Sequence, residues 1–296
     1  MTTTSRGRGS TPSPEELRRI ARDAAAAVAP PLAEAFRAEV SARTKTSAHD
    51  LVTHHDERTE AELVELLTAA VPGSSVLGEE GGRHPGDSTA EGVPHVEWII
   101  DPIDGTSNFV HGFDLFSVSI AAALDGEVVA GVVHAPAAGL VFTAARGAGA
   151  RLKDARGCRT LAAPSPRAQG PESTMNLVTS YPAAEALHRE GSAAAEAFAE
   201  LVQTYATVRR LVSGALELCF AAAGWADVVL TVDAKPWDVA AAQLILREAG
   251  GTLVTCDDAG GTVSPAHLAP HTLGLAPGVQ APTAVRLLGE ICARRS

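Results

Sequence analysis

The sequence predicts a mixed fold of helices and sheets, built in two parts that differ in the order of their elements. In the first part, helical segments precede two apolar runs, 116–124 and 127–134, which an Asp-Gly pair separates. Asp-Gly between apolar runs is a strong signal for a β-hairpin. In the second part strands and helices alternate, which is typical of a sheet covered by helices. A segment rich in Pro, Ser and Gly, 162–173, separates the two parts.

The first part opens with helical signals. Ser13 and Pro14 stand in the order expected of an N-cap followed by proline at the first helical position. Pro30 and Pro31 predict an interruption, with a second helical stretch to about Ala42. The other elements expected here are a helix over 56–70, an exposed loop over 81–94, and strands over 97–101 and 140–145.

The second part yields four expected strands and four expected helices. The strands are 176–180, 208–212, 227–232 and 252–255, and the helices are 184–205, 214–224, 237–249 and 281–293. We therefore predict a disordered segment over 1–14, an α+β subdomain over 15–165 with most metal ligands, and an α/β subdomain over 166–296.

Composition excludes several classes of partner. The chain of 296 residues carries 24 Lys and Arg against 35 Asp and Glu, which argues against nucleic acid or an anionic membrane. Aromatic residues make up only 4%, too few for a surface on which bases stack. There is no apolar segment long enough to span a membrane and no secretory signal, so a cytoplasmic protein is expected.

Four cysteines stand far apart, without a CxxC pair. They are Cys158, Cys219, Cys256 and Cys292. A chain of this length buries about 75% of its unfolded surface and needs no disulfide in order to fold. We therefore expect small buried hydrophobic residues or surface thiols in a reducing compartment.

An acidic cluster after the strand at 97–101 carries the chemistry. Asp101 and Asp104 flank Pro102, which prevents the strand from continuing, so the chain turns and both carboxylates can converge. The carbonyl of Ile103 is a hard oxygen ligand, and such ligands select Mg²⁺ or Mn²⁺ over Zn²⁺. Without cations the carboxylates would repel. Consecutive N–H groups after Asp104 could bind a phosphate.

Two further acidic segments, Gly78-Glu79-Glu80 and Trp237-Asp238, accompany this cluster. With them, the chain resembles the inositol monophosphatase family, metal-dependent and lithium-sensitive sugar phosphatases, from about residue 15 to the C-terminus. The matching segments are WIIDPIDGTSNF at 98–109, WDVAAA at 237–242 leading to EAGG at 248–251, and Lys45 with Asp50-Leu51-Val52-Thr53, Asp56 and Glu60. The resemblance implies a layered αβαβα sandwich.

The resemblance also implies the roles of individual residues. Glu79, Asp101 and the Ile103 carbonyl would hold a first Mg²⁺, while Asp101, Asp104 and Asp238 would hold a second. Asp56 and Glu79 could support a third, weaker ion, and Mn²⁺ could substitute.

Catalytic and substrate-binding roles follow in the same way. Asp56 with Thr106, beside Glu79, would orient and deprotonate the attacking water. The other implied substrate contacts, besides Asp104 and Thr106, are Gly105, Ser107, Ser213, Gly214 and Asp233. Lys45 could organise the acidic site or meet the phosphate.

One departure limits what the resemblance implies about substrate. Members that act on myo-inositol phosphate place a Glu seven residues before the metal-binding Asp of the Trp-Asp segment. Here that position is Thr231, and a carboxylate appears two residues later, at Asp233. Either Asp233 substitutes with altered reach, or the pocket prefers another alcohol.

The expected function is therefore Mg²⁺-dependent hydrolysis of a small polyol or sugar phosphate, with inositol 1-phosphate favoured. Histidinol phosphate and fructose 1,6-bisphosphate are alternatives, and nucleoside bisphosphates are the least favoured. A weakly active member with a binding or regulatory role is the non-enzyme alternative, which five acids suited to metal binding argue against. Family members are often dimers, so a homodimer is compatible with the resemblance.

Overall fold

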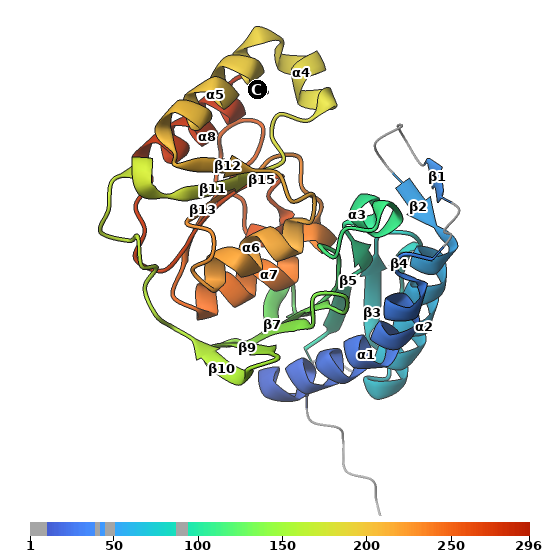
Figure 1. The fold of residues 1–296 in the computed structure, drawn as a ribbon. Coiled ribbons are helices and arrows are strands. Elements are labelled where there is room, and N and C mark those ends of the chain that lie inside the picture. Colours follow the sequence, from blue (N-terminus) through green and yellow to red (C-terminus); the bar gives the residue numbers. More distant parts are fainter. Residues whose placement is uncertain (1–10, 39–41, 45–50, 87–93) are drawn as a thin grey trace, which may run out of the picture.

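Five layers of helix and sheet alternate through the molecule (Figure 1), a computed structural model that describes residues 11–38, 42–44, 51–86 and 94–296. Helices α1 (Pro14–Ala35) and α2 (His54–Ala70) cover one face of an eight-stranded sheet. Helices α6 (Gly214–Ala222) and α7 (Pro236–Glu248) lie between this sheet and a five-stranded sheet. Helices α4 (Ala184–Glu190), α5 (Ser192–Thr204) and α8 (Pro282–Ala293) form the last layer. The predicted αβαβα sandwich is confirmed.

The eight-stranded sheet takes all its strands from residues 75–161. Its order is β10-β9-β8-β7-β6-β5-β3-β4, and only β3 and β5 pair in parallel. The strands are β3 (Ser75–Gly78), β4 (Gly82–His84), β5 (Val96–Asp104), β6 (Ser117–Leu124), β7 (Glu127–Ala135), β8 (Leu140–Ala145), β9 (Ala150–Asp154) and β10 (Gly157–Leu161). The Asp125-Gly126 hairpin is confirmed, since both turn residues have positive φ and Leu124 pairs with Glu127.

The five-stranded sheet has the order β12-β11-β13-β15-β14, with β11 parallel to both its neighbours. Its strands are β11 (Asn176–Thr179), β12 (Thr207–Arg209), β13 (Val228–Thr231), β14 (Thr252–Cys256) and β15 (His271–Leu275). The remaining elements are a ladder of β1 (Ala42–Thr44) and β2 (Leu51–Thr53), helices α3 (Thr106–His111), α4 (Ala184–Glu190), α5 (Ser192–Thr204) and α8 (Pro282–Ala293), and 3₁₀ turns at Glu172–Thr174 and Ala266–Leu268.

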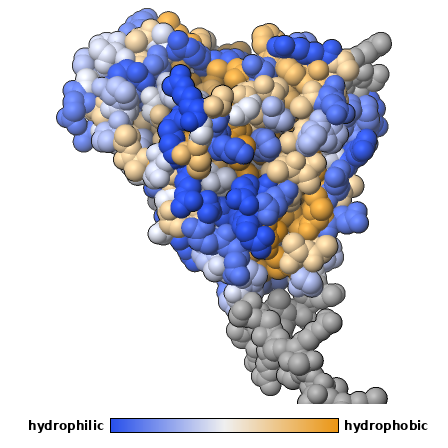
Figure 2. All heavy atoms as spheres, turned by 60° about the horizontal axis from the view of Figure 1, so that its bottom comes forward, coloured by the Kyte–Doolittle hydropathy of each residue, from blue (hydrophilic) through white to orange (hydrophobic). Residues whose placement is uncertain are grey.

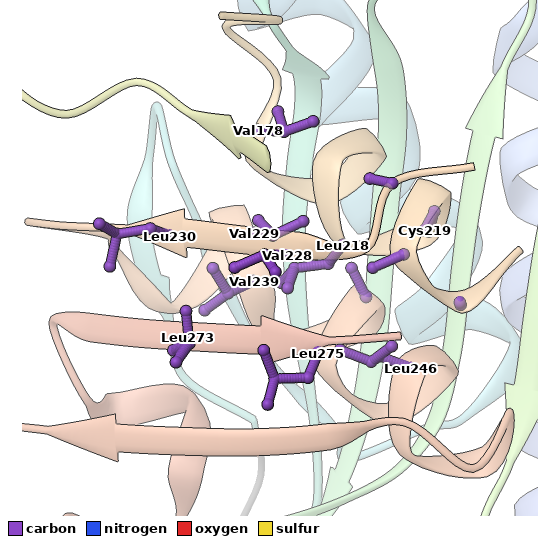
Figure 3. Packing of buried hydrophobic residues seen from close by; sticks show 14 of the residues in the cluster. Val178, Leu218, Cys219, Val228, Val229, Leu230, Val239, Leu246, Leu273 and Leu275 are labelled. Carbon is purple, nitrogen blue, oxygen red and sulfur yellow. The ribbon is translucent and has the colours of Figure 1, made fainter. Parts of the chain in front are cut away.

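The middle helices join the two sheets through a continuous apolar core. Leu218 of α6 and Val239 and Leu246 of α7 pack beside Val229 and Leu273 of the small sheet (Figure 3). On the other side α7 lies against the large sheet so closely that a Cβ on Gly131 would stand 2.6 Å from the Ala241 carbonyl oxygen. The position of α7, and of the side chains at its first turn, is thereby fixed.

The predicted break at Pro30-Pro31 is wrong, because α1 runs through both prolines to Ala35. Proline at these positions removes hydrogen bonds to the carbonyls of Ala26 and Ala27. Both alanines lie on the exposed face of α1, where water can take those bonds.

Two other boundaries differ from the prediction. β5 does not end at Asp101 but continues to Asp104, with a shift of register against β6 between these two residues. The helix expected over 184–205 is divided in two at Gly191, whose φ is 61°. β1, β2, β3, β4, β9, β10 and β15 were not predicted from the sequence.

The expectation for the cysteines is also wrong in part. Cys256 at the end of β14 and Cys292 in α8 form a disulfide, whereas Cys158 is an exposed thiol and Cys219 a buried one. Cysteines 36 positions apart give no pairing signal, and it is the packing of α8 on the small sheet that brings them together.

The face turned forward in Figure 2 is mostly hydrophilic, with a hydrophobic stripe running down it. No helix in the described part of the chain is both long and apolar enough to cross a membrane. The expected disordered segment lies largely outside the described residues, as do Lys45, Asp50 and half of the loop expected over 81–94. The division of the chain near residue 165 stays a prediction.

Candidate active site

Most of the predicted site residues line one pocket of about 350 Å³. One wall comes from β5, the turn before α3 and the loop after β3, and the other from α6, the first turn of α7 and the end of β13. The predicted residues on these walls are Glu79, Asp101, Ile103, Asp104, Gly105, Thr106, Ser107, Ser213, Gly214, Asp233 and Asp238.

Asp56 lies directly behind this lining and is tied to it through Thr106. It is completely buried in the first turn of α2, where its Oδ2 accepts hydrogen bonds from the Thr53 amide (2.8 Å) and hydroxyl (2.6 Å). Its Oδ1 is 2.9 Å from Thr106 Oγ1, which is also 3.0 Å from the Ile103 carbonyl oxygen. The reciprocal Thr53–Asp56 bonds form a capping box, so the local sequence itself fixes the carboxylate.

The loop that carries Glu79 is held by a buried residue of α2. The Glu60 carboxylate accepts the amides of Glu80 (2.9 Å) and Gly81 (2.5 Å). Gly78 leaves room for this carboxylate, since a Cβ there would lie 2.5 Å from it. Glu60 therefore fixes the turn from which Glu79 faces the pocket.

The shift of register in β5 brings two carboxylates to the same pocket. Asp101 and Asp104 are 2% and 5% exposed, and the Ile103 amide donates to Asp101 Oδ1 at 3.0 Å. Pro102 lies within this irregularity, a position that proline tolerates in a strand. The predicted end of the strand at Pro102 is wrong, because the strand bulges there and continues, and this bulge brings the two carboxylates together.

Asp104 is also the anchor of α6. It accepts hydrogen bonds from the Ser213 hydroxyl and from the amides of Gly214 and Ala215, both at 3.0 Å. Ser213 and Gly214 therefore meet Asp104 directly, and the N-terminus of α6 faces a carboxylate, as its dipole favours.

Asp238 reaches the pocket from the first turn of α7. Its Oδ2 accepts the Lys235 amide at 2.7 Å. Burial raises the pKa of Asp238 to about 7; the Lys235 amide opposes the rise, and the charges of Asp104 and Glu79 add to it.

The same causes act on the two aspartates of β5. Burial and the charges of Glu79, Asp104 and Asp238 raise the pKa of Asp101 well above its usual value. Burial raises the pKa of Asp104 to about 6, although its hydrogen bonds from Ser213 and Ala215 oppose the shift. Each carboxylate of the group therefore resists ionisation next to the others.

Within the described residues, no lysine or arginine forms an ion pair with Asp101, Asp104 or Asp238. Buried charges are normally paired or bound to metal ions. The donors here are carboxylates and one carbonyl, all hard oxygens, and the described residues that line the pocket include no thiol and no imidazole. This donor set fits Mg²⁺ or Mn²⁺.

The turn after Asp104 is shaped by its contacts with the other wall. Gly105 has a φ of 92°, and a Cβ on it would lie 2.9 Å from the Leu115 carbonyl oxygen and 3.1 Å from that of Val212. The Asn108 side-chain amide donates to the carbonyls of Leu115 (2.6 Å) and Leu211 (2.7 Å). Asn108 therefore joins the two walls. The residues at the start of α3 line the pocket, and the first amides of a helix have no intrahelical acceptor.

The remaining predicted contact, Asp233, follows β13 in a left-handed conformation (φ 64°) on the pocket wall. Its Oδ1 accepts a hydrogen bond from Arg295 and lies 3.8 Å from Arg189. Burial would raise the pKa of Asp233, but the hydrogen bond and charge of Arg295 outweigh it and the pKa is lowered. Thr231 also lines the pocket, and its Oγ1 is buried without a hydrogen-bond partner among the described residues.

Sequence reasoning missed one acidic residue of the pocket. Glu217, 2% exposed on α6, lies 3.4 Å from the Ser180 hydroxyl. Burial and the charge of Asp104 raise the pKa of Glu217 to about 8. A single acid within the apolar run of 215–223 was the available signal, because such a residue in a buried helix needs partners.

A second group of metal-ligand type lies beside the pocket and consists of Asp233, Asp258 and His271. All three residues already have hydrogen-bond partners. His271 Nε2 is 2.9 Å from Asp258 Oδ1, and His271 Nδ1 is 3.3 Å from the Asp233 amide nitrogen. The Asp233 carboxylate accepts a hydrogen bond from Arg295. The arginine next to Asp233 disfavours a cation there.

Comparison with known proteins identifies the family. The family model described as "Inositol monophosphatase family" matches residues 13–293. The inositol-1-monophosphatase of Mycobacterium bovis is 40% identical over 261 residues, 84% of this chain and 87% of that protein. The Nus factor SuhB of Vibrio cholerae is 38% identical over 225 residues, 76% of this chain and 78% of that protein.

Structural comparison agrees. The solved structure of Mycobacterium tuberculosis SuhB superposes with a TM-score of 0.72 at 34% identity, covering 94% of this chain and 98% of that chain. The fold and the family match are those of a phosphatase, a hydrolase of phosphate esters. The chain belongs to the inositol monophosphatase family, which is generally metal-dependent and acts on small phosphate esters.

Proposed function

We propose that this chain hydrolyses the phosphomonoester of a small polyol or sugar, with inositol 1-phosphate as the favoured substrate, and that it requires Mg²⁺. The observation that carries the proposal is the meeting of Asp101, Asp104 and Asp238 in one pocket without a described basic partner. Such an arrangement is unfavourable unless cations join it.

The residues that would hold the ions are those that line the acidic wall. Glu79, Asp101 and the Ile103 carbonyl would bind a first Mg²⁺, and Asp101, Asp104 and Asp238 a second; Asp56 with Glu79 could support a third. When bound, magnesium supplies the positive charge and Lewis acidity that phosphate ester hydrolysis needs.

Asp56 and Thr106 would handle the proton of the attacking water. The Thr106 hydroxyl bonds Asp56 Oδ1, so it can accept a proton from water while its own proton passes to the carboxylate. The Thr53 bonds to Asp56 Oδ2 keep the carboxylate oriented during this transfer. Glu79, on the same wall, would help to place the water. The attack is direct and in line, with no phosphoenzyme.

Substrate would be held from both walls. The amides of Gly105, Thr106 and Ser107, at the start of α3, would bind the phosphate. Ser213 and Gly214 would contribute through Asp104, which they bond, and Asp233 would face the alcohol. A homodimer and a cytoplasmic location remain predictions.

Phosphate release from myo-inositol 1-phosphate, histidinol phosphate and fructose 1,6-bisphosphate tests this proposal. We expect turnover with Mg²⁺, its loss in EDTA, and the highest kcat/KM for inositol 1-phosphate. Higher kcat/KM for another substrate would reassign the substrate. No turnover on a broad panel of phosphate esters would refute the enzyme activity and favour a binding role.

A further inference from the structure

The pocket wall formed by the end of β13 is held by a buried arginine. Arg295, just after α8, donates through Nη1 to Asp233 Oδ1. Its side chain is completely buried, whereas that of Asp233 is 42% exposed at the pocket wall. A buried guanidinium thus reaches a partly exposed carboxylate from behind.

The same guanidinium has a second, fully buried partner. Arg295 Nε and Nη2 lie 2.9 and 2.7 Å from Glu190 Oε1, at the end of α4. Glu190 Oε2 accepts a hydrogen bond from the Tyr181 hydroxyl at 2.7 Å and one from Arg294 Nε at 3.0 Å. The planar fork of arginine allows one side chain to bond two carboxylates in fixed directions, which lysine cannot do.

The network therefore connects two separate segments of the pocket wall. Tyr181 follows Ser180, which lines the pocket beside Glu217, and Asp233 lines it after β13. Glu190 accepts a hydrogen bond from Tyr181, and Arg295 donates to both Glu190 and Asp233. These bonds link the segment of Tyr181 to that of Asp233. Among the described residues, Arg295 alone donates a hydrogen bond to the Asp233 carboxylate, since Arg189 lies 3.8 Å from the same oxygen.

Asp233 keeps acceptor capacity for a ligand. Both basic contacts go to Oδ1, and no hydrogen bond from the described residues reaches Oδ2. An ionised carboxylate offers about four acceptor sites on its two oxygens. A ligand group that donates hydrogen bonds, such as a sugar or polyol hydroxyl, matches this oxygen.

We propose that Arg295 is a positioning residue for substrate specificity: it holds Asp233 so that the free carboxylate oxygen accepts a hydrogen bond from a hydroxyl of the leaving alcohol. The inference rests on the phosphatase activity proposed above. In this inference the Asp233 carboxylate recognises the alcohol, and Arg295 holds it from outside the pocket. The chain has Thr231, and not an acid, at the last position of strand β13.

The test compares two substrates that differ in hydroxyl groups. KM and kcat are measured with Mg²⁺ for myo-inositol 1-phosphate and for phenyl phosphate, which has no hydroxyl for Asp233 to bind. The variants are R295M, R295K, D233N and the double variant R295M/D233N. The matched control is R294M, which removes the neighbouring arginine and its bonds to Glu190 and Tyr181 but leaves Asp233 untouched.

We expect R295M to raise KM for the inositol phosphate about tenfold, the usual effect of losing a hydrogen bond to a charged group. Phenyl phosphate kinetics stay at the wild-type level, R295K falls between R295M and wild type, and R294M keeps the wild-type ratio of kcat/KM for the two substrates. Since Arg295 acts through Asp233, the double variant has the same ratio as D233N.

Several results would overturn the inference alone: an equal loss on both substrates in R295M, additive effects in the double variant, or a wild-type ratio in D233N. The D233N result stands even if both Arg295 variants fail to fold. Absence of phosphate release by the wild-type protein from myo-inositol 1-phosphate and from every other phosphate ester tested is a different outcome, which refutes the proposed function and the inference with it.

Discussion

Buried carboxylates occur in two parts of this molecule, and the two groups differ in whether basic side chains neutralise them. In the five-stranded half, Asp227 is completely buried and bonds Arg167 at 2.6 Å, Ser165 at 2.6 Å and the Asn176 amide at 2.7 Å. Glu190 is likewise bonded by Arg294 and Arg295. Around the pocket, the charges that act on Asp101 and Asp104 are those of other carboxylates, and for Asp238 the charges of Asp104 and Glu79 outweigh that of Lys235.

The first group consists of carboxylates that the fold itself neutralises with arginines, and the second of carboxylates suited to binding a cation. A buried ion pair carries its own counter-charge, so its contribution is independent of solution composition. The pocket carboxylates have raised pKa values, so their ionisation is disfavoured, and bound cations would favour it. Neutralising a charge should therefore have opposite effects on stability in the two places.

The largest effect should come from Asp101→Asn. We expect phosphate release to fall roughly a thousandfold, since metal-assisted charge stabilisation is worth several kcal/mol in the transition state. In EDTA the variant should melt at a higher temperature than the wild type, because one of the repelling charges is gone. A steady-state assay and a thermal melt measure both, with the exposed Asp23→Asn as control. A lower melting temperature in EDTA would contradict the contrast between the two regions.

Arg167→Met tests the other side of the comparison. Removing the partner of Asp227 leaves a buried carboxylate uncompensated, and we expect a loss of about 3 kcal/mol in the free energy of unfolding. Denaturant titration measures this loss, and the exposed pair of Arg22 with Asp23 supplies the control R22M. Activity of the folded variant should be retained, so an inactive but equally stable R167M would show that the pairing serves the site rather than the fold.

The effect of pH sharpens the comparison further. The pKa of Asp104 rises from 3.8 to about 6, that of Asp238 from 3.8 to about 7 and that of Glu217 from 4.5 to about 8 on folding. Between these values the folded state binds more protons than the unfolded state, so stability in EDTA should fall as pH rises from about 4 to about 8. Mg²⁺ should offset the fall, since it binds the ionised carboxylates.

Melting temperatures with EDTA and with millimolar Mg²⁺, measured across this pH range, provide the check. The stabilisation by Mg²⁺ should grow as pH rises. A constant difference between the two curves would mean that the pocket acids are already ionised without metal.

Glu60→Gln should have the smallest effect, because Glu60 is an intermediate case, a buried acid bonded by backbone amides. The amide side chain keeps one acceptor oxygen for the loop of Glu80 and Gly81. We expect roughly tenfold weaker Mg²⁺ activation, the scale of effects from groups that orient metal ligands. A Mg²⁺ titration of activity measures this, and Glu62→Gln on the same helix is the control. Unchanged Mg²⁺ dependence would remove Glu60 from the support of Glu79.

A structural feature of this molecule could be predicted from the sequence when the residues that determine it are close together in the chain. The Asp125-Gly126 hairpin and the N-cap at Ser13 are set by residues close in the chain, and both were predicted correctly. The acidic segments can also be recognised locally, and their carboxylates line one pocket. Pro30 and Pro31 were misjudged because their tolerance depends on which face of α1 is exposed.

Features that depend on distant segments escaped prediction. The pairing of Cys256 with Cys292 and the contact of Arg295 with Asp233 need the packing of α8, which no local pattern encodes. The pocket residues could be named only because family motifs mark them; Glu217, outside those motifs, was missed.

The origin of Asp238 has a consequence for the order of folding. Its carboxylate joins those of Asp101 and Asp104 only after α7 has docked between the two sheets, more than a hundred residues further along the chain. Long-range contacts of this kind form late, because they need a large loop to close. Metal affinity should therefore appear only in the last kinetic phase of refolding, and a Mg²⁺ or Mn²⁺ titration during refolding would report completed assembly more strictly than helix content does.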